Sequence, residues 1–163
     1  MHLTESRSLA GVLRPVIVEC RARISATNGQ CGGHLRTVIA PRLRPGDRVI
    51  YLGDHDLSGN QIEANTRRVL EREIGGDLLW ERLALTAEQV REYDLPVIIK
   101  RDRRYKDGHP HEAIETEALR QTVLQDLLRD RLDELLPEPL ARVQEREARQ
   151  RRRIATVLRR ARR

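Results

Sequence analysis

The pattern of apolar and polar positions switches repeatedly between a strand period and a helix period. Val49, Ile50, Tyr51 and Leu52 form an unbroken run of β-prone residues, which predicts a strand buried on both faces of a sheet. Apolar residues three or four positions apart follow this run, and that spacing predicts an amphipathic helix. Because such segments alternate along the chain, we expect an α/β fold with a parallel sheet, right-handed crossovers and flanking helices.

Turn signals and capping residues set the boundaries of the predicted elements. Ser6 or Ser8 is the expected cap of the first helix, and Thr86 is the expected cap of a short later helix. Ser58 and Gln61 match a capping box, which predicts where the helix after the central strand begins. The predicted strands cover residues 3–5, 24–27, 49–52 and 78–85, and the predicted helices cover residues 9–20, 34–40, 58–74, 87–93, 117–136 and 140–162.

Three segments are left outside this scheme. A Gly-rich turn is predicted at residues 28–33, and residues 97–99 are apolar without a clear place in the sheet. Residues 100–111 are predicted to be a polar, charged loop. Pro137 and Pro139 break the chain before the last helix. We therefore predict an α/β domain at residues 1–136 and a basic helical extension at residues 137–163.

Charge is concentrated in that extension. Residues 141–163 carry ten arginines and two glutamates, a net charge of +8, whereas the rest of the chain carries a net charge of −2. A basic segment of this kind attracts phosphate groups over long distances, so DNA is the expected partner. A solubilising or dimerising helix is the alternative. With one Trp, three Tyr and no Phe, base stacking is a disfavoured way of binding nucleic acid.

Other features of composition narrow the class of protein. No run of 18 apolar residues is present, which argues against a membrane span, and the first residues lack the pattern of a signal peptide. Cys20 and Cys31 have no metal-binding spacing, and their context suggests a reducing cytoplasm. We therefore expect a cytoplasmic protein with no membrane partner.

Carboxylates gather where predicted strands end. Asp54 and Asp56 follow the central strand, and Glu5 ends the first strand. Because parallel strands present their carboxyl ends at one edge, the three side chains are expected to share a site. Unpaired carboxylates beside buried strands need a cation, and hard oxygen ligands suit Mg²⁺ or Mn²⁺. A plain polar turn at residues 54–56 and a solvated Glu5 are the alternatives.

Several other polar residues are weaker candidates. Lys100, Arg101 and Arg103 are expected to bind phosphate or to lie in a solvated loop, and Arg149, Arg152 and Arg153 are expected DNA contacts on the last helix. Glu115 and Glu117 either reach the acidic site or only complement a helix dipole. Strand alternation directs His55 away from the two neighbouring aspartates.

The acidic motif resembles that of the Toprim domain. The resemblance rests on Glu5 at the end of the first strand and on Gly-Asp-His-Asp-Leu-Ser-Gly at residues 53–59. It implies a Toprim (Rossmann-like) fold in which Glu5, Asp54 and Asp56 hold Mg²⁺ at DNA phosphates. Further blocks at residues 4–13, 61–70, 82–90 and 115–119 are similar to uncharacterised Toprim-like proteins of phages and bacteria, related to the Toprim domain of the topoisomerase VI A-subunit.

The resemblance also limits the expected chemistry. Toprim topoisomerases carry a nucleophilic tyrosine in a winged-helix-type domain, and Tyr51, Tyr93 and Tyr105 lie in no such domain. The favoured hypothesis is therefore cleavage of nucleic-acid phosphodiesters by metal-activated water, with Glu5, Asp54 and Asp56 as metal-binding and catalytic residues. A non-catalytic DNA-binding or regulatory subunit, working with a protein partner or as a homodimer, is the alternative. A small-phosphoester hydrolase is a third hypothesis.

Overall fold

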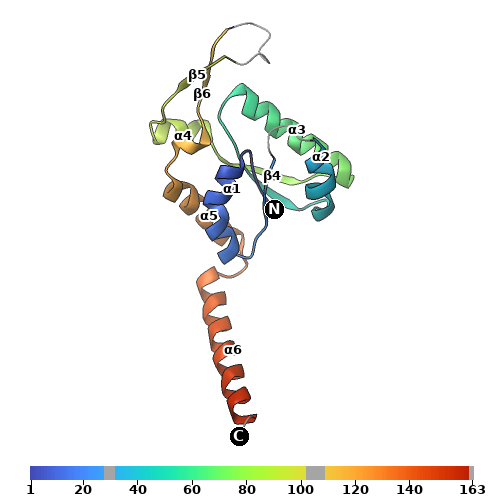
Figure 1. Cartoon of the computed structure of the whole chain (residues 1–163), viewed down its shortest axis with the longest axis vertical. Coiled ribbons are helices and arrows are strands. Elements are labelled where there is room, and N and C mark those ends of the chain that lie inside the picture. The colour runs from blue at the N-terminus through green and yellow to red at the C-terminus, as the bar shows by residue number, and fades with distance from the viewer. Residues whose placement is uncertain (28–31, 102–108, 162–163) are drawn as a thin grey trace.

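The core of the protein is a parallel sheet. The computed structural model describes residues 1–27, 32–101 and 109–161. Four strands are hydrogen-bonded in the order β2-β1-β3-β4, and every neighbouring pair is parallel. Their bounds are β1 His2–Thr4, β2 Ile24–Ala26, β3 Arg48–Leu52 and β4 Leu79–Ala84. The predicted α/β class with a parallel, helix-flanked sheet is confirmed (Figure 1).

Alternation along β3 divides the core into two layers. Val49 and Tyr51 pack with Leu70 of helix α3 (Leu57–Ile74) and with residues of the segment 35–43. Ile50 and Leu52 belong to the opposite layer, which is built from helices α1 (Arg7–Glu19) and α5 (Gln121–Leu135). Val49 to Leu52 are all at most 1% exposed, so β3 is buried on both faces, as its apolar run predicts.

Most of the predicted helices are present. Ser6 caps α1 by accepting a hydrogen bond from the Leu9 amide, and Thr86 caps α4 in a capping box with Gln89. Gly75 ends α3 in the left-handed region at φ 70°, where glycine is favoured. The bounds are α1 Arg7–Glu19, α3 Leu57–Ile74, α4 Ala87–Glu92, α5 Gln121–Leu135 and α6 Leu140–Ala161.

The predicted cap of α3 is wrong. Asp56, rather than Ser58, is the N-cap, and its carboxylate accepts a hydrogen bond from the Gly59 amide. Aspartate caps a helix as well as serine does, and an Asp56 cap starts the helix two residues earlier. The acidic turn and the helix therefore share a residue.

Two other boundaries also differ from prediction. Gly32 begins a helical segment, with α2 Gly32–His34 continuing into η1 Leu35–Ile39 and η2 Ala40–Arg42. Near residue 117, a short 3₁₀ turn, η3 Thr116–Ala118, precedes α5. Leu119 and Arg120 have extended ψ angles, which separate this turn from the helix.

The apolar segment near residue 98 forms a hairpin outside the main sheet. Strands β5 Ile98–Lys100 and β6 His111–Ala113 pair in an antiparallel sheet of their own. Part of the predicted polar loop thus consists of strand ends, and its residues 102–108 lie outside the described part of the chain. An isolated bridge between His55 and Ile114 attaches the chain just after β6 to the acidic turn.

Helix α6 extends away from the rest of the protein (Figure 1). Its first turns contact the end of α1, where Arg21 pairs with Glu147 at 3.0 Å. Farther along, its apolar residues Ile154, Val157 and Leu158 are each more than half exposed, so they do not pack on this chain's own domain. Among the described residues, no helix has the length and apolar character that crossing a membrane requires.

Candidate metal centre at the carboxyl edge of the sheet

Glu5 and the acidic turn meet because β1 and β3 are parallel neighbours. Thr4 lies beside Leu52 in the register, and the Glu5 amide donates to the Leu52 carbonyl at 3.0 Å. Beyond this point, Glu5 Oε2 accepts a hydrogen bond from the Asp54 amide at 3.2 Å. Residues 49 positions apart are therefore joined at the edge where parallel sheets place their ligands.

Asp54 is fixed by a residue beyond the hairpin. Its Oδ1 atom accepts hydrogen bonds from the Thr116 amide at 2.9 Å and from the Thr116 hydroxyl at 3.0 Å. Its Oδ2 atom faces the Lys100 ammonium group at 3.8 Å. One oxygen of Asp54 is thus used by the protein, and the other is directed at a cation.

In Asp56, as in Asp54, one carboxylate oxygen is bonded to the protein and the other faces Lys100. Asp56 is 8% exposed, and its Oδ1 atom caps α3 by accepting from the Gly59 amide at 2.6 Å. Its Oδ2 atom lies 3.5 Å from Lys100 Nζ. A Cβ atom at position 59 would lie 2.5 Å from the Asp54 carbonyl oxygen, so this close turn requires glycine there.

Lys100 occupies the centre of the carboxylate cluster. Besides Asp54 and Asp56, its Nζ atom contacts Glu115 at 3.2 Å. The cluster therefore consists of Asp54, Asp56 and Glu115 around Lys100, with Glu5 beside Asp54. Sequence reasoning named each of these residues but did not predict that the lysine lies between the carboxylates.

The pKa shifts agree with a crowded acidic site. Burial, and then the charge of Asp54, raises the pKa of Glu5 above its ordinary value. Burial also raises the pKa of Asp54, despite the opposing hydrogen bonds from Thr116. For Lys100, burial alone lowers the pKa, but the bond to Glu115 and the charges of Asp54 and Asp56 outweigh it, and the net shift is upward.

Arg82 of β4 donates hydrogen bonds to the acidic turn, and sequence reasoning did not identify it. Its guanidinium group is bound to Glu63 at 2.7 Å and to Asn60 at 3.2 Å, both on α3. It also donates to three backbone carbonyls at 2.8–3.3 Å, those of Gly53, Asp54 and Leu85. Five hydrogen bonds from one arginine thus connect β4, α3 and the turn that carries the carboxylates.

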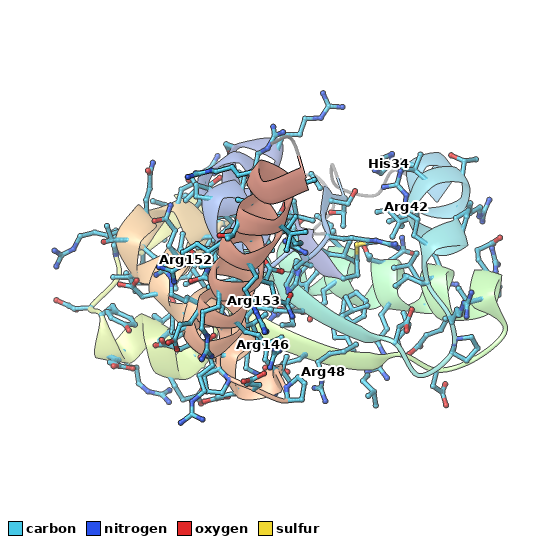
Figure 2. The ribbon with its side chains drawn as sticks, turned by 90° about the horizontal axis from the view of Figure 1, so that it is seen from below. His34, Arg42, Arg48, Arg146, Arg152 and Arg153 are labelled. Atoms are coloured by element: carbon cyan, nitrogen blue, oxygen red, sulfur yellow. The ribbon has the colours of Figure 1, made fainter. Side chains whose placement is uncertain are left out.

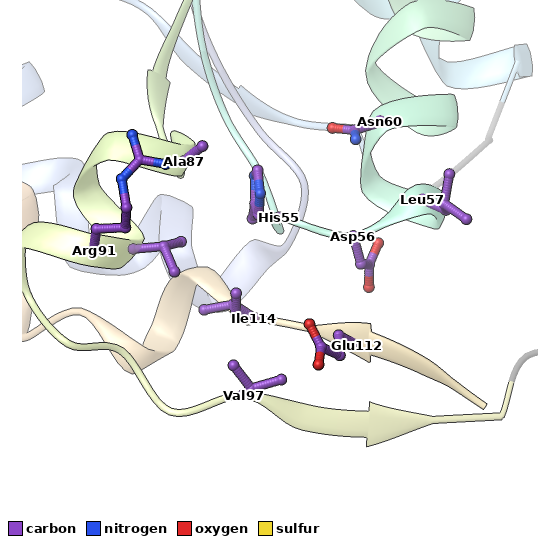
Figure 3. Close-up of a pocket in the computed structure, with 10 residues that line it drawn as sticks. His55, Asp56, Leu57, Asn60, Ala87, Arg91, Val97, Glu112 and Ile114 are labelled. Atoms are coloured by element: carbon purple, nitrogen blue, oxygen red, sulfur yellow. The ribbon is translucent and has the colours of Figure 1, made fainter.

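Two hollows adjoin the cluster. A pocket of about 250 Å³ is lined by seven residues, Glu5, Ser6, Leu9, Asp54, Glu115, Thr116 and Glu117. In its wall, Glu117 accepts hydrogen bonds from the hydroxyls of Ser6 and Ser8, each at 3.0 Å. A second pocket, of about 400 Å³, lies beside Asp56 and includes His55, Asn60, Arg91 and Glu112 (Figure 3). Asp56 therefore borders both the cluster and this second pocket.

The donor set fits a magnesium ion in part. Mg²⁺ usually takes one or two carboxylates and retains waters, and the Oδ2 atoms of Asp54 and Asp56 both face one cation. Glu5 Oε2 is turned to the Asp54 amide instead. Within residues 1–27, 32–101 and 109–161, no set of three or more His, Cys, Asp or Glu side chains has metal-binding geometry. Two carboxylates are thus the fitting ligands, and Glu5 is a neighbour.

The basic candidates separate into two regions. Lys100 lies in the cluster, and Arg101 beside it is exposed. Arg103 lies outside the described residues. Arg149, Arg152 and Arg153 are exposed on α6, where Arg152 and Arg153 extend from the helix (Figure 2). The β5–β6 hairpin and α6 lie at opposite ends of the molecule, so these arginines are not part of the acidic site (Figure 1).

Comparison with known proteins adds no relative: no family model, no curated protein and no solved structure matches the chain.

Proposed function

We propose that the chain is a Toprim-type protein that cleaves nucleic-acid phosphodiesters with the help of Mg²⁺ or Mn²⁺. The observation that carries this proposal is the meeting of Glu5 and Asp54 at the carboxyl edge of the parallel sheet, with Asp56 two residues on. The order of these residues and the glycines at positions 53 and 59 match the motif on which the Toprim resemblance rests.

The two aspartates and Glu5 have different proposed roles. Asp54 and Asp56 hold the ion through their Oδ2 atoms, because their Oδ1 atoms are already committed to Thr116 and Gly59. When bound, the ion supplies neutralisation of phosphate charge and acidification of water. Glu5, with its raised pKa, is suited to take the proton of the attacking water or to join as a further ligand.

Helix α6 is proposed to attract the nucleic acid. Its exposed arginines include Arg149, Arg152 and Arg153, and residues 141–163 hold a net charge of +8. Because α6 projects from the end of the molecule opposite the hairpin, it acts by increasing the local concentration of DNA rather than by contacting the scissile phosphate.

A non-catalytic role is the second candidate. The exposed helix α6 favours it, because a protruding basic arm with an exposed apolar stripe is suited to join DNA and a partner chain without any reaction. In that case the acidic cluster is a structural ion-pair network centred on Lys100. A protein partner or a second copy of the chain then takes up Ile154, Val157 and Leu158.

Nicking of supercoiled plasmid in Mg²⁺ or Mn²⁺ distinguishes these functions. We expect the wild type to cleave and the variants Glu5→Gln, Asp54→Asn and Asp56→Asn each to lose cleavage. Asp126→Asn is the matched control, because Asp126 is an exposed carboxylate on α5 that pairs only with the nearby Arg129 among the contacts described here. DNA binding without cleavage by the wild type in either ion would support the non-catalytic role instead.

A further inference from the structure

The Lys100 ammonium group lies between the two carboxylates that are proposed to hold the ion. Its Nζ atom lies 3.8 Å from Asp54 Oδ2 and 3.5 Å from Asp56 Oδ2. Among the described residues, these are the aspartate oxygens that are not bound to Thr116 or Gly59. Glu115 approaches the same atom at 3.2 Å. Asp54, Asp56 and Glu115 thus share one counter-ion, and the chain itself supplies it.

The rest of the hairpin does not depend on Lys100 for its attachment. The backbone of Ile114 is hydrogen-bonded to that of His55 in both directions, at 2.9 and 3.2 Å. Thr116 binds Asp54 Oδ1 with both its amide and its hydroxyl. Lys100 itself is about one-third exposed at the end of β5 and carries a flexible four-carbon stem. Its side chain can therefore turn outward while the carboxylates stay in place.

We infer that Lys100 is a tethered counter-ion that a divalent metal must displace, an inference that rests on the proposed metal-dependent function. Mg²⁺ binds carboxylate oxygens at about 2.0–2.1 Å, so a dication on these oxygens would lie within a few ångströms of the ammonium group. Like charges at that separation repel strongly in a partly buried site. Metal and lysine thus exclude each other from the cluster, and the cluster keeps a cation in both states.

Displacement gives the lysine a second position. Its stem keeps the ammonium group near the cluster after it leaves the carboxylates, on the solvent side from which a phosphate would approach. Lys100 then lowers metal affinity in the free protein and supplies a positive charge beside the substrate in the loaded one. The same residue is expected to weaken metal binding and to strengthen phosphate binding.

Manganese titrations followed by electron paramagnetic resonance test this directly. Lys100→Met removes the charge but keeps an unbranched chain, and Lys100→Arg is the matched control that keeps the charge. We expect Lys100→Met to bind Mn²⁺ about tenfold or more tightly than the wild type. Lys100→Arg should stay near the wild type. Equal or weaker binding by Lys100→Met would overturn the inference, because Lys100 would then help the metal or be irrelevant to it.

A second measurement uses the unmodified protein. Lys100 and Lys106 are the only lysines in the chain, so amine acylation followed by mass spectrometry reports them separately. Saturating Mg²⁺ should raise the acylation rate of Lys100 severalfold relative to Lys106, and Asp54→Asn with Asp56→Asn should abolish that effect. An unchanged ratio in protein shown to bind Mg²⁺ would mean that Lys100 stays in the cluster, contrary to the inference.

Mn²⁺ binding by the wild type and by Lys100→Met separates an error in this inference from an error in the proposed metal centre. If the wild type binds Mn²⁺ but Lys100→Met gains no affinity, the inference is wrong and the metal centre remains. If neither the wild type nor Lys100→Met binds Mn²⁺ at any tested concentration, the metal centre and the inference are both wrong. Binding by Lys100→Met alone would support the inference in its strongest form.

Discussion

Arg82 offers a sharp test of how the acidic turn is held. Replacing it with methionine keeps much of the stem but removes all five hydrogen bonds of its guanidinium group. Among the described residues, the Trp80 indole would remain as a donor to Glu63, at 2.8 Å. Because the side chains of Arg82 and Glu63 are only 17% and 16% exposed, this leaves a nearly buried carboxylate without its counter-ion.

The expected loss is large for a single substitution. Removing one member of a buried ion pair typically costs about 3 kcal/mol or more, and the unpaired carbonyls add to this loss. For a chain of this length, about 3 kcal/mol corresponds to a fall in melting temperature of roughly 6–12 °C. Replacing both partners, as Arg82→Met with Glu63→Gln, should recover part of the loss because no charge remains buried alone.

Urea denaturation followed by circular dichroism measures the free energy of unfolding. Arg67→Met is the matched control, because Arg67 pairs with Glu71 on the same helix but is 47% exposed. Such a surface pair contributes about 0.5 kcal/mol or less. A loss for Arg82→Met no larger than that for Arg67→Met would refute the view that Arg82 holds the turn.

Three further predictions concern charge, packing and the arm. Because burial raises the folded-state pKa of Asp54, its ionisation destabilises the metal-free fold as pH rises above its ordinary pKa. In EDTA melts, Asp54→Asn should therefore gain stability over the wild type as pH rises, and a gain that grows toward low pH would contradict this. Gly59→Ala should lower the free energy of unfolding by about 1–3 kcal/mol in urea denaturation, because its Cβ would lie 2.5 Å from the Asp54 carbonyl oxygen. The control Gly11→Ala, which faces open space on α1, should be neutral or stabilising, and equal effects of the two substitutions would contradict this. Deleting residues 141–163 should weaken DNA binding in fluorescence anisotropy and flatten its salt dependence, and an unchanged salt slope would show that the arm does not bind DNA.

The architecture of the sheet could be predicted from local patterns. A continuous apolar run such as that of β3 is stable only between two helical layers, and the alternation of strands and helices allows few topologies other than a parallel sheet. That topology in turn brings Glu5 to Asp54, across 49 positions of sequence. The meeting of these two residues is therefore a consequence of periodicity rather than of any local motif.

Features that depend on competing local choices were harder to predict. Ser58 and Asp56 are both good helix caps, and the hydrogen bond from the Gly59 amide to Asp56 identifies Asp56 as the cap that forms. The apolar residues Ile98 and Ile99 resemble a core strand, yet they are 38% and 64% exposed in a separate hairpin. Periodicity gives no information about which sheet an apolar segment joins.

Side-chain convergence on the acidic site was not predictable either. Lys100 reaches Asp56 across 44 positions and Thr116 reaches Asp54 across 62, and both contacts depend on the hairpin's attachment through Ile114. Arg82 lies beside Tyr51 only because β3 and β4 are parallel, and the register shifts directly after this pair. No local pattern marks an arginine in a strand as the residue that holds a neighbouring turn.

The thermal response to Mn²⁺ tests the metal centre most directly. Ligand at about 100 times its dissociation constant stabilises a folded protein by about 2.7 kcal/mol, which corresponds to a rise in melting temperature of roughly 5–10 °C for a chain of this length. We expect such a rise in the wild type and none in the double variant Asp54→Asn with Asp56→Asn, which should still fold without metal. A rise of the same size in the double variant would contradict the assignment of Asp54 and Asp56 as the metal ligands.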